Sequence, residues 1–542
     1  MNNIKRKGEQ IMARELKYYN DSYQGSLADE QCAALDYYID LNNKKGSEDQ
    51  LLHCIKEMTK EETGKLIYDY ETFGVPTRQY ETPQGTLLDY QTIGVAFAFH
   101  AGNYINGDSV GMGKTVETAG FYNVMTKYYE HIQSEIPYRM LVLTEKNLVD
   151  QFRFEMVRFT GQFFRRVPNA ENREVSDFIL NNPADLPLKA SVIGTHALIK
   201  SNEFIAWLEQ CRANHNFPFH TLVVDESSVL GGKSTNLIVK AFKLLSKHFK
   251  KIIFLNATPF ESHLEIFYNQ LALLDPKMLP AKTVFQEQYC QMRWMGNYKK
   301  PTGKYKNTDR FKQLIKYHYF ARTRKDRGAQ MNNCKGGIIM SELSPIQKEW
   351  LHKTQMYKCV FDCPNVLSED IEFNEDNVPK LASLMNLIEN EAADEPSILI
   401  FTYYKEAQRS LSLYLDGRDI THEILNGETK QADRFRIIEE FKQNKFRVLI
   451  TNVQKGLNFG NCNFLVFYSI DPNPSKMIQF EGRITRALDI DNKTVYILCS
   501  KGKEEKSLLA TVKARAKAAT ELTNTDISVL LDILLGGEVD ET

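Results

Sequence analysis

The sequence of 542 residues is too long for one small core, because a domain holds about 150 residues on average. Hydrophobic residues make up 42% and charged residues 25%, which is ordinary for folded proteins and excludes wholesale disorder. The 68 Lys and Arg against 69 Asp and Glu leave a net charge of -1, so any surface that binds a polyanion must be local.

Residues 1–85 are predicted to form an accessory region that is mostly helical, because helical spacing is found at 31–41 and 50–58. No motif in this region indicates a particular chemistry. Its first ten residues are polar and lack the apolar stretch of a signal peptide. The 9 cysteines are too scattered for a disulfide scaffold and fit a reducing compartment. These features predict a cytoplasmic protein.

The longest apolar run, 86–105, is predicted to be a buried helix. It contains Asp89, Gln91 and His100, which are costly inside a membrane. We therefore expect no membrane partner.

Apolar, β-branched runs recur along the rest of the chain and predict central strands. They fall into two groups, at 140–143, 190–193, 221–224 and 252–255, and at 397–401, 447–450, 464–468 and 494–498. Between most of them lie stretches with helical spacing, such as 147–159 and 433–442, and this alternation predicts parallel sheets covered by helices. The expected fold class is α/β, with two tandem doubly wound parallel-sheet lobes, helical insertions and the N-terminal helical region.

The expected domains follow these two groups of strands. They are the accessory region at 1–85, lobe 1 at 86–335 with a helical extension and the basic segment 293–327, lobe 2 at 336–506, and a C-terminal helical tail at 507–542.

Residues 107–115 are typical of a phosphate-binding loop that leads into a helix. Gly111 and Gly113 would let backbone N–H groups close around phosphates, at a helix N-terminus that favours negative charge. Lys114 would reach the β- and γ-oxygens, and Thr115 would ligate Mg²⁺. The first glycine of the strict pattern is missing, so a chance Gly-Lys-Thr turn is the structural alternative.

The apolar run 221–224 delivers two adjacent carboxylates at its end, Asp225 and Glu226. Nucleotide sites lie at such strand ends. Asp225 could hold Mg²⁺ through its water shell, and Glu226 could orient and deprotonate the attacking water. A structural turn is the alternative for this pair alone.

Arg483 and Arg486 are three residues apart and are predicted to share one helix face. Arginine neutralises a transferring phosphoryl group by bidentate contacts, and supplying it from a second lobe would make hydrolysis depend on lobe closure. A surface helix with ordinary salt bridges is the alternative.

The segment 293–327 contains 12 Lys or Arg residues and two acids, and it predicts a local nucleic-acid surface or a solvated helix-loop face. Lys299, Lys300 and Arg310 are candidates to bind DNA phosphates. A second biased segment, 362–376, has six acids and no base, and is predicted to be a loop.

The order of these motifs resembles superfamily 2 helicase-type motors, and specifically the Swi/Snf-like branch of double-stranded-DNA translocases, over about 87–506. The sequence Asp-Ser-Val-Gly-Met-Gly-Lys-Thr at 108–115 is similar to the branch's Asp-Glu-Met-Gly-Leu-Gly-Lys-Thr. The stretch 255–276 resembles its motif III and helical continuation, and 479–486 resembles its motif VI. The resemblance implies RecA-like lobes.

The resemblance also assigns roles that the residue chemistry does not. It implies that Gln91, Gly456 and Gln479 contact the nucleotide, and that Thr258 couples the ATP site to DNA. Thr144, Thr195 and His196 are implied to contact DNA phosphates.

The predicted activity is a nucleic-acid-dependent ATPase with ATP and Mg²⁺ as cofactors and double-stranded DNA as partner. It would translocate on duplex DNA and remodel DNA or protein–DNA complexes. The alternatives are a strand-separating helicase, an ATPase that acts on RNA polymerase or another DNA-bound protein, and an ATP-switched nucleic-acid clamp. Because no bromodomain-like or chromodomain-like segment is recognisable, a bacterial or viral source is expected.

Overall fold

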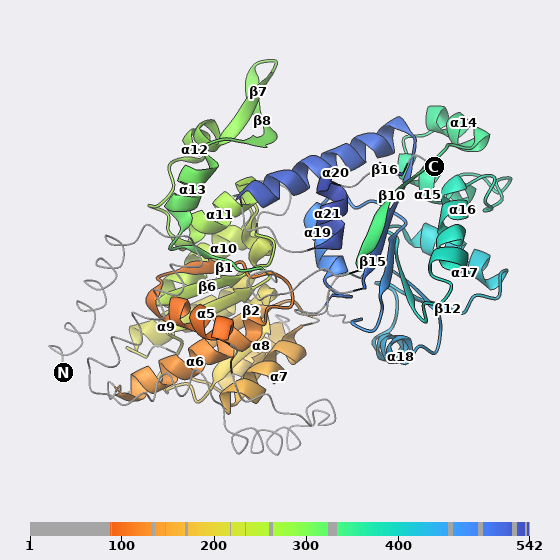
Figure 1. Ribbon diagram of the computed structural model, residues 1–542. Coiled ribbons are helices and arrows are strands. Elements are labelled where there is room, and N and C mark those ends of the chain that lie inside the picture. Colours follow the sequence, from red (N-terminus) through yellow and green to blue (C-terminus); the bar gives the residue numbers. More distant parts are fainter. Residues whose placement is uncertain are drawn as a thin grey trace.

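The computed structural model describes residues 87, 89–131, 134, 136–146, 148–167, 172–216, 218–233, 235–259, 264–323, 333–453, 459–485, 492–522, 528–536 and 539–540. They form two α/β lobes, each built on its own parallel sheet (Figure 1). This confirms the predicted fold class. The helices predicted within residues 1–85 lie outside the described residues.

Lobe 1 contains a seven-stranded sheet in which every pair of neighbours is parallel, in the order β3-β4-β2-β5-β6-β1-β9. Its strands are β1 (Tyr104–Asn106), β2 (Met140–Thr144), β3 (Phe164–Val167), β4 (Ser191–Thr195), β5 (Thr221–Asp225), β6 (Lys251–Leu255) and β9 (Tyr319–Phe320). Its helices are α5 (Asp89–His100), α6 (Lys114–His131), α7 (Val149–Thr160), α8 (Asn172–Leu180), α9 (Asn202–Ala213), α10 (Leu237–Leu245) and α11 (Leu264–Leu274).

Both faces of this sheet are buried, as the continuous apolar runs predict. Along β2, Met140 and Val142 belong to one core cluster, and Leu141 and Leu143 to the other, because successive side chains point to opposite faces. Because all neighbouring strands are parallel, their carboxyl ends lie at one edge of the sheet. The loops that follow β1, β5 and β6 meet at this edge.

Lobe 2 repeats this plan with the strand order β12-β13-β11-β14-β15-β10-β16, again parallel throughout. Its strands are β10 (Lys335–Ser341), β11 (Ile398–Phe401), β12 (His422–Leu425), β13 (Val448–Thr451), β14 (Phe464–Phe467), β15 (Thr494–Ser500) and β16 (Val539–Asp540). Its helices are α14 (Pro345–Lys353), α15 (Tyr357–Asp362), α16 (Pro379–Asn386), α17 (Lys405–Asp416), α18 (Gln431–Lys442), α19 (Pro474–Glu481), α20 (Lys503–Leu522) and α21 (Val529–Gly536).

A protruding extension follows α11 in lobe 1. It consists of α12 (Lys282–Tyr289), an antiparallel hairpin of β7 (Cys290–Met295) and β8 (Tyr298–Tyr305), and α13 (Thr308–Ile315). In Figure 1 the hairpin projects from the top of lobe 1, and α20 runs from lobe 2 to the base of this extension. The expected division at 506/507 falls inside α20, which is one continuous helix.

All eight predicted strands are present, as β2, β4, β5, β6, β11, β13, β14 and β15. The prediction of one helix over 86–105 is wrong for residues 101–105, because α5 ends at His100 and β1 begins at Tyr104. Asn103 fixes the turn between them, since its side chain donates to the carbonyl of Leu274 and accepts from the N–H of Ile252.

The basic segment also differs from prediction. Its first half forms an antiparallel hairpin and not a helix. Hydrophobic periodicity does not predict this hairpin, because its exposed strands lack an apolar face. Among the described residues, no helix has the length and apolar character needed to cross a membrane.

Candidate active site

The predicted phosphate loop connects β1 to α6. Gly111 and Gly113 have φ angles of 84° and 86°, in the left-handed region that favours glycine. Lys114 begins α6, and its Nζ donates to the carbonyls of Asp108 at 2.6 Å and Ser109 at 3.2 Å. The lysine is thereby held against the loop that it is predicted to serve.

Arg322 ties this loop to its neighbours. It lies two residues after β9, is 4% exposed, and donates from its backbone N–H and Nε to Asp108 Oδ1 at 2.7 and 3.2 Å. Its terminal nitrogens pair with Asp108 and Glu117 and donate to the carbonyl of Tyr90. Burial raises the pKa of Glu117 to about 8, with Arg322 acting against the shift. Gly94 is required here, because a Cβ on it would lie 2.6 Å from the Glu117 carboxylate.

Sequence reasoning misses this cluster. Arg322 falls within the basic segment, and Asp108 departs from the strict glycine pattern and matches the Swi/Snf-like motif, but neither observation pairs it with Arg322. An arginine inside a short apolar strand region is the available signal, because such a charge is buried only when it is paired.

The two predicted carboxylates lie at the end of β5. Asp225 accepts a hydrogen bond from the Thr144 hydroxyl at 2.8 Å, and Glu226 adopts φ 49° and ψ 51°. Burial raises the pKa of Asp225 to about 7, and the charge of Glu226 adds to the shift. Burial lowers the pKa of Lys114, although Asp108 and both of these carboxylates act against it. The lysine and the carboxylates are thus close enough to interact.

Thr115 and Gln91 complete the lobe 1 side. The Thr115 hydroxyl lies near the carboxylate of Glu155 on α7, whose pKa is raised by burial while this hydroxyl acts against the shift. Gln91 on α5 is 6% exposed, and its Nε2 donates to the carbonyl of Met112 at 3.4 Å. Gly113 is again the residue that allows this approach, since a Cβ on it would lie 2.4 Å from Gln91 Nε2.

Lobe 2 contacts this site directly. Gln479 on α19 donates from Nε2 to the Thr258 hydroxyl of lobe 1 at 2.8 Å. Gly482 packs against Val110 of the phosphate loop, since a Cβ on Gly482 would lie 3.0 Å from Val110 Cγ1. The predicted coupling and nucleotide residues of the two lobes therefore meet.

Arg483 lies close enough to two carboxylates of lobe 1 to interact with their charges. Burial lowers its pKa, and the charges of Glu226 and Glu145 act against that shift across the lobe boundary. The prediction that Arg483 shares a helix face with Arg486 is wrong for the described part of the motif, because α19 ends at Glu481 and Gly482 caps it. Arg483 reaches lobe 1 from the turn after the helix. Arg486 and Gly456 lie outside the described residues.

The residues predicted to bind DNA lie in different surroundings. Thr144 is fully buried and bonded to Asp225, so its side chain belongs to the carboxylate site and not to a DNA surface. His196 Nε2 lies 2.7 Å from the carbonyl of Asp225, and the buried Thr195 hydroxyl has no hydrogen-bond partner among the described residues. Lys299, Lys300 and Arg310 belong to the protruding extension, on β8 and α13.

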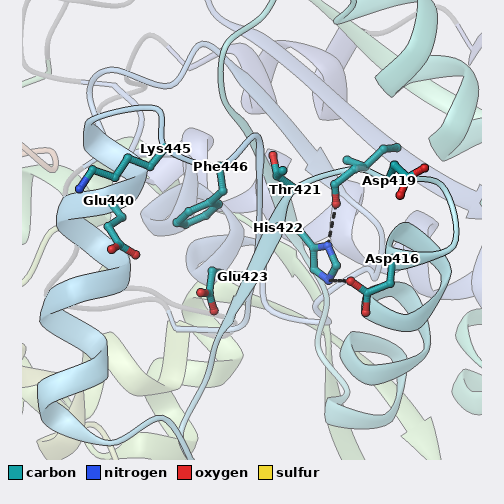
Figure 2. Close-up of a pocket in the computed structure, with 9 residues that line it drawn as sticks. Asp416, Asp419, Thr421, His422, Glu423, Glu440, Lys445 and Phe446 are labelled. Carbon is teal, nitrogen blue, oxygen red and sulfur yellow. Dashed lines mark hydrogen bonds and ion pairs between the residues drawn. The ribbon is translucent and has the colours of Figure 1, made fainter.

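A separate hollow of about 550 Å³ lies at the outer edge of lobe 2, beside β12 (Figure 2). Figure 2 shows His422 between Asp416 and the backbone of residue 420, with Glu440, Lys445 and Phe446 across the opening. None of its lining residues belongs to the inter-lobe site. The predicted chemistry is thus found where the lobes meet, not in this hollow.

Comparison with known families matches the two lobes. The SNF2-related domain family matches residues 31–394, which is more than half of the chain, and the helicase conserved C-terminal domain matches residues 379–488. The chain belongs to the SNF2-related family. This family consists of superfamily 2, helicase-like ATPases that depend on nucleic acid, so the predicted Swi/Snf-like class, enzyme type and use of ATP are confirmed at the level of the family.

Similar curated proteins are distant members of the same family. The SWI/SNF-related matrix-associated actin-dependent regulator of chromatin subfamily A-like protein 1 of Bos taurus is 23% identical over 482 residues, which cover 82% of this chain and 46% of that protein. Chromodomain-helicase-DNA-binding protein 7 of Homo sapiens is 21% identical, over 80% of this chain and 16% of that protein. The SNF2-related chain thus spans less than half the length of these relatives.

A bacterial relative is closer in length. The uncharacterized ATP-dependent helicase YqhH of Bacillus subtilis is 20% identical over 75% of this chain and 74% of that protein. Among solved structures, the Sulfolobus solfataricus SWI2/SNF2 ATPase core in complex with dsDNA is 17% identical, with a TM-score of 0.35, and covers 84% of this chain and 98% of its own.

Proposed function

We propose that this chain is an ATP-dependent motor that translocates on double-stranded DNA without separating its strands, and so remodels DNA or protein–DNA complexes. The observation that carries the proposal is the contact of the two lobes at one site, where Arg483 of lobe 2 faces Glu226 of lobe 1. A site divided in this way makes hydrolysis depend on the relative position of the lobes.

The residues on the lobe 1 side fit Mg²⁺-ATP by their chemistry. The glycine loop offers backbone N–H groups and Lys114 to phosphates, and Gln91 lies beside the loop for the base. Thr115 and Asp225 supply the hard oxygen atoms that Mg²⁺ prefers. When bound, Mg²⁺ supplies positive charge to the β- and γ-phosphate oxygens.

The protein's own groups then divide the reaction. Glu226 orients the attacking water and accepts its proton. Arg483 stabilises charge on the transferring phosphoryl group, with Arg486 of the same motif assigned to this task by resemblance. The bond between Gln479 and Thr258 links motif VI of lobe 2 to the loop that follows β6, the strand beside β5. Closure of the lobes and hydrolysis are thereby coupled.

Double-stranded DNA is the proposed substrate, held by contacts to its phosphates. Lys299, Lys300 and Arg310 offer positive charge on the extension, Thr195 is the last residue of β4, and His196 follows it. Contacts to phosphates carry no sequence information, which suits a motor that must pass every base. A bacterial or viral source is part of the proposal, supported by the similarity to the Bacillus subtilis protein over most of its length.

Two assays test this function. Displacement of a third strand from a triplex reports translocation, and release of one strand from a forked duplex reports unwinding. We expect ATP-dependent activity in the first and little in the second, with Glu226→Gln inactive in both. Fork unwinding without triplex displacement would contradict the proposal in favour of a helicase. Stimulation of the ATPase by RNA polymerase and not by DNA would contradict it in favour of a transcription-linked enzyme, and ATP-dependent DNA retention without displacement in favour of a clamp.

A further inference from the structure

The tip of the β7–β8 hairpin exposes a tryptophan. Trp294 is 65% exposed and its neighbour Met295 is 47% exposed, whereas Trp207 in lobe 1 is buried at 3%. The Trp294 ring thus lies outside the core, at the end of a protruding element, where its flat apolar face is open to a ligand.

The hairpin has a rigid base and a narrow end. Trp294 pairs with Lys299 and Met295 with Tyr298, which leaves a two-residue turn whose first residue, Gly296, has φ 69°. At the other end, Met292 and Tyr305 pack against the lobe 1 core, and α20 of lobe 2 contacts β8. The tryptophan is therefore presented on a fixed arm.

The charge around the tip is of one sign within the hairpin. Residues 290–306 contain five bases and no acid, namely Arg293, Lys299, Lys300, Lys304 and Lys306. Lys299 Nζ lies 5.2 Å from the centre of the Trp294 ring, and its ion pair with Glu287 of α12 is long at 3.9 Å and largely exposed. A ring flanked by cations fits a ligand that has both a flat apolar face and a phosphate.

We propose that the hairpin tip binds an unpaired nucleotide next to a DNA duplex, by stacking Trp294 on the base while the surrounding lysines and arginine contact the adjoining phosphates. Base faces inside a duplex are already stacked, so a rigid ring finds one only at an end, a gap or a junction. The inference rests on the proposed function, because lobe 1 would have to hold the neighbouring duplex. It makes DNA junctions and ends the preferred loading sites of the motor.

The test compares two oligonucleotides in binding to the full chain, measured by fluorescence anisotropy. One is a blunt duplex and the other is the same duplex with a single-stranded extension that carries 2-aminopurine at its first unpaired position. We expect tighter binding to the extended duplex and quenching of 2-aminopurine. Trp294→Ala should reduce the preference by roughly 5- to 150-fold, the range for loss of one stacked base, and abolish the quenching.

Two further variants make the test specific. Trp294→Phe keeps an aromatic face and should restore most of the preference and quenching. Trp350→Ala is the matched control, because Trp350 also has a lysine, Lys353, 5.4 Å from its ring centre, and its helix α14 in lobe 2 lies away from the hairpin in Figure 1. It should change neither readout.

The inference is wrong if Trp294→Ala leaves the preference unchanged, or if it weakens binding to both oligonucleotides equally, which would make the hairpin a simple phosphate contact or a protein-binding surface. The proposed function fails separately, if the wild-type chain shows no ATPase stimulation by blunt duplex DNA.

Discussion

Asp225 and Glu226 are adjacent in sequence but differ in surroundings. Asp225 is bonded to Thr144 and has a pKa raised to about 7 by burial, whereas Glu226 leaves the strand in a left-handed conformation and faces Arg483. The backbone thus gives the two carboxylates different surroundings, which fits the proposed division of tasks in which Asp225 holds Mg²⁺ and Glu226 acts on the attacking water.

Substitution of Glu226 by Gln should lower ATP turnover by about 10²- to 10⁴-fold, because an amide cannot accept the proton of the attacking water. Nucleotide binding should persist, since the phosphate loop and Lys114 are untouched. Steady-state phosphate release and nucleotide binding measure the two effects. Lys114→Ala should lose binding as well, and near-normal phosphate release by Glu226→Gln would remove this residue from the reaction.

Arg322 holds three acceptors that no shorter or narrower side chain can reach together. Arg322→Lys should therefore raise the KM for ATP and lower stability, even though it keeps the charge. Arg322→Met should cost about 3–5 kcal/mol of unfolding free energy, because it leaves two buried carboxyl groups without their cation. Urea unfolding and the KM for ATP check this, with Arg310→Lys on the exposed face of α13 as a control that should not alter stability. An unchanged KM and unfolding midpoint in Arg322→Lys would show that the fork is dispensable.

The candidate nucleotide residues of lobe 1 can be proposed from the sequence because their chemistry is tied to a local pattern of glycines, lysine and carboxylates. Buried ion pairs between distant segments cannot. Asp362 falls in the segment predicted to be an acidic loop, yet it is 3% exposed and pairs with the buried Lys380 at 2.8 Å, which also pairs with Glu505. Such pairings join residues far apart in the chain, and a charge count along the sequence contains no information about them.

At the scale of elements, long apolar strands are predictable and short or exposed ones are not. β1 has three residues and β9 has two, so neither shows a period, although they carry the phosphate loop and Arg322. Likewise, α19 ends before the two arginines whose spacing indicates a shared helix face, and the residue that caps it, Gly482, packs against Val110 of lobe 1.

The basic extension should give DNA affinity a strong dependence on salt. Reversing the charges of Lys299, Lys300, Lys304, Lys306, Arg310 and Lys312 should flatten the plot of log affinity against log salt, by about 0.9 for each phosphate that is no longer neutralised. Titration of duplex DNA at several salt concentrations measures this slope. The same slope in the charge-reversed variant would mean that the extension is a solvated face that does not contact DNA phosphates.

His220, directly before β5, should make the unfolding free energy fall in acid. It is 3% exposed, its Nδ1 accepts from the N–H of Arg139 at 3.1 Å, and burial lowers its pKa to about 3. Below a pH of about 6.5, His220 binds a proton in the unfolded chain but stays neutral in the native chain. The unfolding free energy should therefore fall by up to about 1.4 kcal/mol per pH unit.

Denaturant unfolding between the two pKa values checks this. His220→Phe should show lower stability at neutral pH, because the N–H of Arg139 loses its acceptor, but a shallower loss on acidification. His352→Gln on exposed α14 should follow the wild type. Parallel curves for wild type and His220→Phe would assign the acid sensitivity to other groups.

At the scale of the whole molecule, helix α20 contacts both lobes. Its first turn is anchored in lobe 2, where Glu505 pairs with Lys380 at 2.7 Å, and Arg515 donates to the carbonyl of Pro472. Further along, Ala519 packs against the lobe 1 core. The helix therefore spans both lobes and meets the base of the hairpin, so a change in lobe position must also move or strain the contact with the extension (Figure 1).

If the ATP site is divided between the lobes, hydrolysis should require a residue of lobe 2. Arg483→Ala should lower turnover by about 10³-fold, the effect of losing an arginine that stabilises the transferring phosphoryl group, while nucleotide binding by lobe 1 persists. Arg418→Ala, which removes an exposed lobe 2 arginine paired with Glu375, is the matched control and should keep normal turnover.

The bond from Gln479 to Thr258 allows a second, quantitative form of the same test. If the two side chains act only through each other, Gln479→Ala and Thr258→Val should each reduce DNA-stimulated turnover, and the double variant should be no worse than the more severe single one. Additive losses would mean that the residues act separately on their own lobes. Such a result, together with near-normal turnover in Arg483→Ala, would mean that lobe 1 hydrolyses ATP without lobe 2. The contact of Gly482 with Val110 would then serve only to hold the two lobes together.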